Sequence, residues 1–173
     1  MINRGISTVW RAVLAALPML PQAVMAQPAA HPFEGTWIRD PALSKPPPNL
    51  PATVPLVSET VSIAHDDGRR DASRIDQTFG NGGKNFFVAD TAEDGSMHPI
   101  DPTDKSLLFG ISVLPDGARK LVSTDDGARM ESTCRVSADA ATMWCEGVYY
   151  ARSGSAGPYS DVYHRASRAM PVS

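Results

Sequence analysis

The stretch MESTCRVSADAATMWCEGVY, Met130 to Tyr149, contains both cysteines of the chain and decides its fold. Residues 138–141 lie midway between Cys134 and Cys145. If residues 137 and 142 face each other across this four-residue loop, counting along two antiparallel strands places Cys134 opposite Cys145. The same register puts three further pairs on that mostly apolar face: Val136 with Met143, Ser132 with Gly147, and Met130 with Tyr149. One register satisfies both the hydrophobic pattern and the sulfur pairing, so the stretch predicts a β-hairpin.

The two cysteines are expected to form a disulfide. Directly opposed cross-strand residues have Cβ atoms about 4.5–5.5 Å apart, near the reach of a disulfide. Closing so short a loop should contribute about 2–3 kcal/mol to stability. The alternatives are two free thiols, or two ligands of a metal ion. Because no third or fourth ligand converges on Cys134 and Cys145, the zinc signal is weak, and we predict no metal and no cofactor.

The other face of this hairpin is expected to meet solvent. Its cross-strand pairs are Arg135 with Trp144, Thr133 with Glu146, and Arg129 with Tyr150. Arginine side chains opposite aromatic rings can form cation–π contacts there.

Turn signals recur along the rest of the chain. They fall at residues 66–68, 80–83, 93–95, 115–117, 125–127 and 153–155. The segments between them run about seven to ten residues, which is strand length, and in Leu107–Val113 alternate residues are apolar. None has the spacing of an amphipathic helix. We therefore predict an all-β chain: a single antiparallel up-and-down meander closed into a barrel of about 8–10 strands, with no long helix in the mature chain.

The first 26 residues have the pattern of a secretory signal peptide. Arg4 and Arg11 give a basic start, Ala12–Leu20 is a short apolar run, and small residues precede Gln27. An amphipathic N-terminal helix is the alternative. The remaining chain is predicted to be one domain: residues 27–57 carry the first strand and a proline-rich strap, residues 58–168 the rest of the barrel, and residues 169–173 a tail. The product is expected to be soluble and periplasmic or secreted, where disulfides form.

Charge argues against polyanionic partners. The leader holds two of the 16 Lys and Arg residues and none of the 19 Asp and Glu residues, which leaves 14 basic against 19 acidic side chains. An acidic chain without a basic cluster is not expected to bind nucleic acid or an anionic membrane surface. No segment after the leader is apolar enough for a transmembrane helix.

The start of the mature chain resembles a known family. Phe33, Gly35, Thr36 and Trp37 match the Gly-x-Trp that opens the first strand of lipocalins. With Ser44-Lys45, the prolines, Glu93-Asp94-Gly95 and Tyr163-His164-Arg165, the chain resembles small exported bacterial lipocalin-like barrel proteins, most of them uncharacterised. The resemblance implies that Trp37 fills one end of the barrel and that Arg165 from the last strand stacks on it.

The last strand carries the candidate chemistry. Tyr159, Asp161, Tyr163 and Arg165 alternate onto one face. If that face points inward, Asp161 needs a partner such as Arg74 or Arg165, or it is a candidate general acid or base. The alternative is a solvent-facing strand or an ion pair at the rim.

The histidines are scattered along the sequence. Among them His98 is a further catalytic candidate, beside Asp161, Tyr159 and Tyr163. We interpret His31 as part of a frayed tail and His65 as a turn residue.

Three functions remain open. The first is a barrel that binds a small, largely apolar molecule, with a wall formed by Phe79, Phe86, Phe109, Met130, Met143 and Tyr149. The second is an enzyme on the same scaffold, a lyase, isomerase or hydrolase that uses an interior Asp or His with a tyrosine. The third is a packed barrel that recognises another envelope protein.

Overall fold

The structure, a computed structural model, describes residues 31–49, 55–66, 69–100, 103 and 105–166. Within these residues the chain forms ten strands and no helix. The strands are β1 (Gly35–Arg39), β2 (Leu56–Asp66), β3 (Arg70–Phe79), β4 (Lys84–Ala92), β5 (His98–Pro99), β6 (Leu108–Val113), β7 (Arg119–Asp125), β8 (Ala128–Val136), β9 (Thr142–Tyr150) and β10 (Ala156–Arg165). The predicted leader, residues 1–26, and the predicted tail, residues 169–173, lie outside the described residues. No helix long and apolar enough to cross a membrane occurs in the described part.

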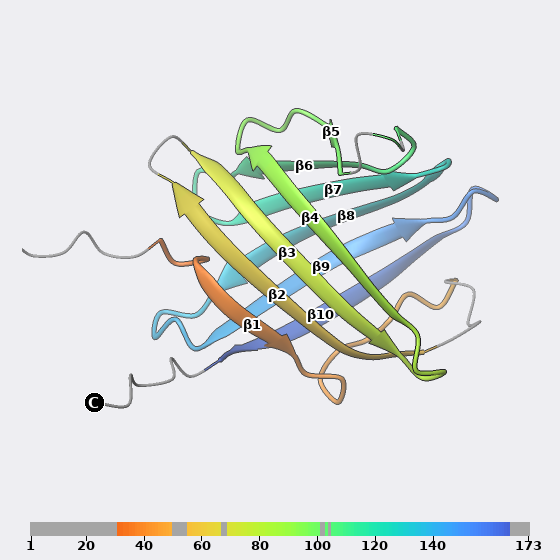
Figure 1. Cartoon of the computed structure of the whole chain (residues 1–173), viewed down its shortest axis with the longest axis horizontal. Helices are drawn as coiled ribbons and strands as arrows, with labels where there is room; N and C mark the ends of the chain where they lie inside the picture. Colours follow the sequence, from red (N-terminus) through yellow and green to blue (C-terminus); the bar gives the residue numbers. More distant parts are fainter. Residues whose placement is uncertain (1–30, 50–54, 67–68, 101–102, 104, 167–173) are drawn as a thin grey trace, which may run out of the picture.

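The strands form one antiparallel sheet in the order β4-β3-β2-β1-β10-β9-β8-β7-β6-β5. Every neighbour in this order is also a neighbour in sequence except β1 and β10, which join the two ends of the meander (Figure 1). The sheet curls on itself, with β2, β3 and β4 crossing over β6–β10 in Figure 1. The predicted up-and-down barrel is therefore confirmed.

The barrel is nearly closed, with a seam between β4 and β6. Beyond β4 the sheet order has no further strand. A single isolated bridge joins Asp94 to Ser112 after the end of β4, where the Gly95 amide also donates to the Ile111 carbonyl at 2.7 Å. The two sides of the seam are thus joined near the β6–β7 turn.

The β8–β9 hairpin has the register expected from the sequence. Cys134 pairs with Cys145 and Val136 with Met143. The two cysteines form a disulfide with their Cα atoms 4.0 Å apart. Both are buried and pack in the core with Trp37 and other apolar side chains.

Trp37 closes one end of the barrel, which we call the closed end. This side chain is fully buried, and its Nε1 donates to the Phe33 carbonyl at 2.8 Å. The Arg165 guanidinium carbon lies 4.1 Å from the centroid of the Trp37 ring. Arg165 also donates to the carbonyls of Ala140 and Pro32, both at 2.6 Å. The expected stacking is thus present, and it ties the N-terminal segment to β10.

The segment after β1 runs beside β10. Lys45 forms an isolated antiparallel β-bridge with Ser160, and the side-chain amide of Asn49 donates from Nδ2 to the Ser155 carbonyl at 3.0 Å. Of the prolines at 46–48, Pro47 is buried while its neighbours are exposed. The strap prediction for residues 50–54 lies outside the described residues.

Candidate functional site

The barrel encloses a cavity of about 470 Å³. Ligand cavities in proteins typically measure about 300–1,000 Å³. It runs from Phe33, Asp71 and Arg119 at the closed end to Asp125 and Arg129 at the opposite end, which we call the mouth. Much of its wall is apolar and includes Phe87, Phe109, Ile111, Leu121, Met130 and Tyr149.

One side of the cavity is polar and is built on β10. Tyr159, Asp161 and Tyr163 all line it, so the alternating face of the last strand points inward. Asp161 Oδ1 accepts from Arg39 Nε at 2.6 Å, and the Arg39 side chain is only 8% exposed. The cavity wall therefore holds an ion pair between β1 and β10.

Tyr159 packs against the neighbouring strand. It pairs with Gly147 of β9, and a Cβ at Gly147 would lie 2.7 Å from the tyrosine ring. Glycine at this position lets the ring lie over the strand. Burial raises the pKa of Tyr159, while a hydrogen bond with Ser132 partly opposes that rise.

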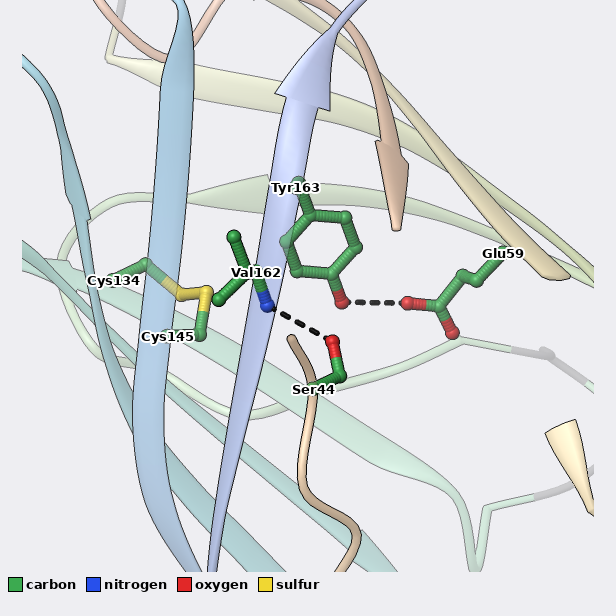
Figure 2. The surroundings of a disulfide bond; sticks show 6 residues. All are labelled: Ser44, Glu59, Cys134, Cys145, Val162 and Tyr163. Carbon is green, nitrogen blue, oxygen red and sulfur yellow. Dashed lines mark hydrogen bonds between the residues drawn. A yellow bond between two sulfur atoms is a disulfide. The ribbon is translucent and has the colours of Figure 1, made fainter. Parts of the chain in front are cut away.

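Glu59 of β2 extends the polar side. This residue is 8% exposed, and its two carboxylate oxygens accept hydrogen bonds from different neighbours. Tyr163 donates its hydroxyl to Oε1 at 2.6 Å, and Gln77 donates Nε2 to Oε2 at 2.6 Å. Figure 2 shows the Tyr163–Glu59 bond beside the disulfide. Burial, followed by the nearby Glu59 charge, raises the pKa of Tyr163 well above its usual value, so the phenol stays protonated as the donor.

A second charged cluster sits at the closed end. Arg119 is buried and donates to Asp71, at 3.1 Å for the Nη2–Oδ1 contact, and to Glu93 at 2.5 Å. Its guanidinium lies 4.5 Å from the centroid of the Phe33 ring. His31 and His65 stack 4.0 Å apart beside it. Burial, then Arg119, lowers the pKa of His31 to about 4.

The same cluster has metal-like spacing. Ligand atoms of His31, His65 and Glu93 all lie within 4.8 Å of one another. However, Arg119 Nη2 contacts Glu93 at 2.5 Å, His31 Nδ1 at 3.1 Å and His65 Nδ1 at 3.5 Å. The guanidinium therefore occupies the position that a metal ion would take.

Four of the six expected wall residues line the cavity: Phe109, Met130, Met143 and Tyr149. Phe79, at the end of β3, is not among the lining residues. The expectation for Phe86 is wrong. Its ring is on the outer face, 60% exposed and 4.8 Å from the Arg74 guanidinium, and the next residue, Phe87, lines the cavity instead.

Among the catalytic candidates, Asp161, Tyr159 and Tyr163 come together in the cavity. His98 does not join them: it is exposed on β5, with Nε2 2.7 Å from Ser96 Oγ. The expected partners of Asp161 were also wrong. Arg74 pairs with Asp76 on the outside and Arg165 stacks on Trp37, whereas the observed partner is Arg39.

Sequence reasoning missed Glu59, Arg39 and Arg119. Extending the alternation of Val61 and Ile63 backwards would have placed Glu59 on the inner face. Arg39 follows Trp37 by two residues, so strand alternation places these two side chains on the same face as well. The interpretations of His31 as part of a frayed tail and of His65 as a turn residue were wrong. His31, which precedes β1, and His65 of β2 both contact Arg119 of β7, which is distant from them in sequence.

No protein-family model matches this chain, and no curated protein matches it in sequence. Among solved structures, the fluorescent protein UnaG is similar: a point mutant of UnaG has a TM-score of 0.52 at 13% identity, over 79% of this chain and 98% of that protein. Wild-type UnaG has a TM-score of 0.51 at 12% identity, over 78% and 97% of the two chains. At this identity the likeness shows the fold alone. Fold and cavity define a lipocalin-like barrel with ten antiparallel strands and a hollow interior.

Proposed function

We propose that this chain is an exported lipocalin-like barrel protein that binds a small, largely apolar molecule inside the barrel. One observation carries the proposal: an interior cavity of about 470 Å³ that the barrel's own side chains leave unfilled. Cavities of this size with mostly apolar walls and a few polar groups are typical of small-molecule sites. The polar side on β10 and β2 would orient the molecule.

The proposed export has separate support. The Cys134–Cys145 disulfide is of a kind that persists in oxidising compartments. The leader-like residues 1–26 and the resemblance to small exported bacterial barrels point in the same direction. The cavity favours ligand binding over a packed barrel that serves only as an interaction surface. For the enzyme alternative, His98 is exposed and is not among the cavity-lining residues, and Asp161, which lines the cavity with Tyr159 and Tyr163, is held in an ion pair with Arg39.

The direct test is binding of N-phenyl-1-naphthylamine, a neutral apolar dye whose fluorescence rises in apolar surroundings. We expect saturable binding at one site per chain. Replacing Ser123, which lines the cavity, by Trp should abolish the signal, because the indole would fill the space. The matched control is Thr124→Trp on the same strand, since neighbouring residues of a strand point to opposite faces.

If Ser123→Trp does not fold, Ala128→Trp at the mouth is the second variant, because Ala128 directly follows the exposed residues 125–127 and a larger side chain has more room there. Dye binding that is equal in Ser123→Trp, Ala128→Trp and Thr124→Trp would place the dye outside the barrel. That result, or no binding to the wild type, would overturn the proposal.

A further inference from the structure

The carboxylate of Glu59 lines the cavity without a cationic partner. Its two hydrogen-bond donors, Tyr163 and Gln77, are both neutral. Among the described residues, no Lys, Arg or His forms an ion pair with it. Buried carboxylates are usually paired with a positive charge, because two neutral hydrogen bonds only partly replace the lost hydration. Glu59 therefore differs from the other buried acids of the barrel.

Arg39, the guanidinium on the neighbouring strand, does not serve Glu59. It is held by Asp161 at 2.6 Å, so this part of the wall has two carboxylates and one guanidinium. Burial is the main cause of the raised pKa of the Tyr163 phenol; the charges of Glu59 and Asp161 raise it further, and Arg39 partly opposes them. The polar side of the cavity is thus negative.

The closed end offers no positive site either. There Arg119 faces two carboxylates, Asp71 and Glu93, and contacts both. A ligand carboxylate at that end would meet a guanidinium that two protein acids already share. The charges on the polar side and at the closed end therefore disfavour an anionic ligand, and at the mouth Arg129 is paired with Glu131 at 2.9 Å.

We infer that the cavity is specific for an apolar molecule that carries a protonated amine, with Glu59 as its counter-charge. This inference rests on the proposed binding function. Each carboxylate oxygen can accept two hydrogen bonds and Glu59 uses one on each, so an ammonium N–H can be accepted without breaking the bonds from Tyr163 and Gln77. The apolar wall opposite, with Phe109, Leu121 and Met130, would cover the hydrocarbon part.

The test is a matched series of ten-carbon competitors against N-phenyl-1-naphthylamine at pH 7: decylamine, decan-1-ol and decanoate. A hydrogen-bonded charge pair in a partly desolvated site should favour decylamine over decan-1-ol by about 10- to 100-fold. Decanoate should bind more weakly than the alcohol. The Glu59→Gln variant should reduce the affinity for decylamine to that for decan-1-ol and leave the alcohol unchanged.

The control is Asp90→Asn, which also removes one negative charge, but from an exposed ion pair with Arg70 outside the barrel. This variant should keep the wild-type order of affinities, with decylamine binding most tightly and decanoate most weakly. Decanoate binding as tightly as decylamine, or a decylamine preference that survives in Glu59→Gln, would overturn the inference while leaving the binding function intact. Absence of binding by the dye and all three competitors would overturn both. If Glu59→Gln does not fold, the ranking in the wild type alone still decides between amine and acid.

Discussion

Arg119 is 2% exposed, and its guanidinium contacts two carboxylates at the closed end, Asp71 and Glu93. Asp71 lies in β3, Glu93 directly follows β4, and Arg119 begins β7. The guanidinium thus joins two strands near one edge of the sheet to a strand near the other edge. Because both acids are buried, Arg119 is their main compensating charge.

Replacing Arg119 by Met should therefore destabilise the protein strongly. The substitution leaves two buried carboxylates without their cation, for which losses of about 3–5 kcal/mol are typical. Urea unfolding followed by circular dichroism would measure the change in the free energy of unfolding. The control is Arg135→Met, which removes an exposed pair with Asp116 and should cost about 0–1 kcal/mol. Similar losses in the two variants would contradict the role assigned to Arg119.

At the residue level, the sequence predicts side-chain direction wherever strand alternation is unbroken. Alternation shows that Tyr159, Asp161 and Tyr163 share one face of the last strand, but it does not show that this face points into the barrel. Phe86 was misplaced because Phe87 beside it is equally apolar, so alternation alone did not separate them. The partner of Asp161 required knowledge that β1 lies beside β10, which depends on closure of the whole barrel.

The β8–β9 hairpin is the element that the sequence predicts most completely. The loop length and the apolar pattern agree with the positions of the cysteines, and such agreement specifies a register. The pairs from Arg129–Tyr150 to Val136–Met143 all match the structure. Local spacing was sufficient because both partners lie within one hairpin.

Removing the disulfide should weaken the protein without changing its fold. In the Cys134→Ala/Cys145→Ala double variant, we expect a loss of about 2–3 kcal/mol, because the bond closes a short loop between residues 11 apart in sequence. Urea unfolding of the variant, compared with wild type in the presence and absence of dithiothreitol, would measure it. Reduced wild type should resemble the variant. A loss near zero would show that the bond adds no stability, and complete unfolding would show that the fold requires it; either result would contradict the prediction.

At the scale of the whole molecule, the meander and strand number could be predicted, but the position of the seam could not. Turn signals reveal how many strands follow one another, while closure depends on which edges meet after the sheet has twisted. Here β1 is short and β10 pairs with it, so the seam falls between β4 and β6 instead of between the first and last strands.

The seam predicts uneven protection from hydrogen exchange. In the sheet order β4 pairs only with β3, whereas β3 pairs with both β2 and β4. Alternate amides of β4 point toward the seam, where one isolated bridge lies beyond the strand, so local opening there breaks fewer hydrogen bonds. Peptides from Lys84–Ala92 should take up deuterium faster than peptides from Arg70–Phe79 in exchange measured by mass spectrometry. The neighbouring β3 is the matched control, because it shares the same curvature and lies at the same side of the barrel (Figure 1). Equal protection of β3 and β4 would mean that β4 is hydrogen-bonded on both sides in solution, and the seam would then not be an edge of the sheet.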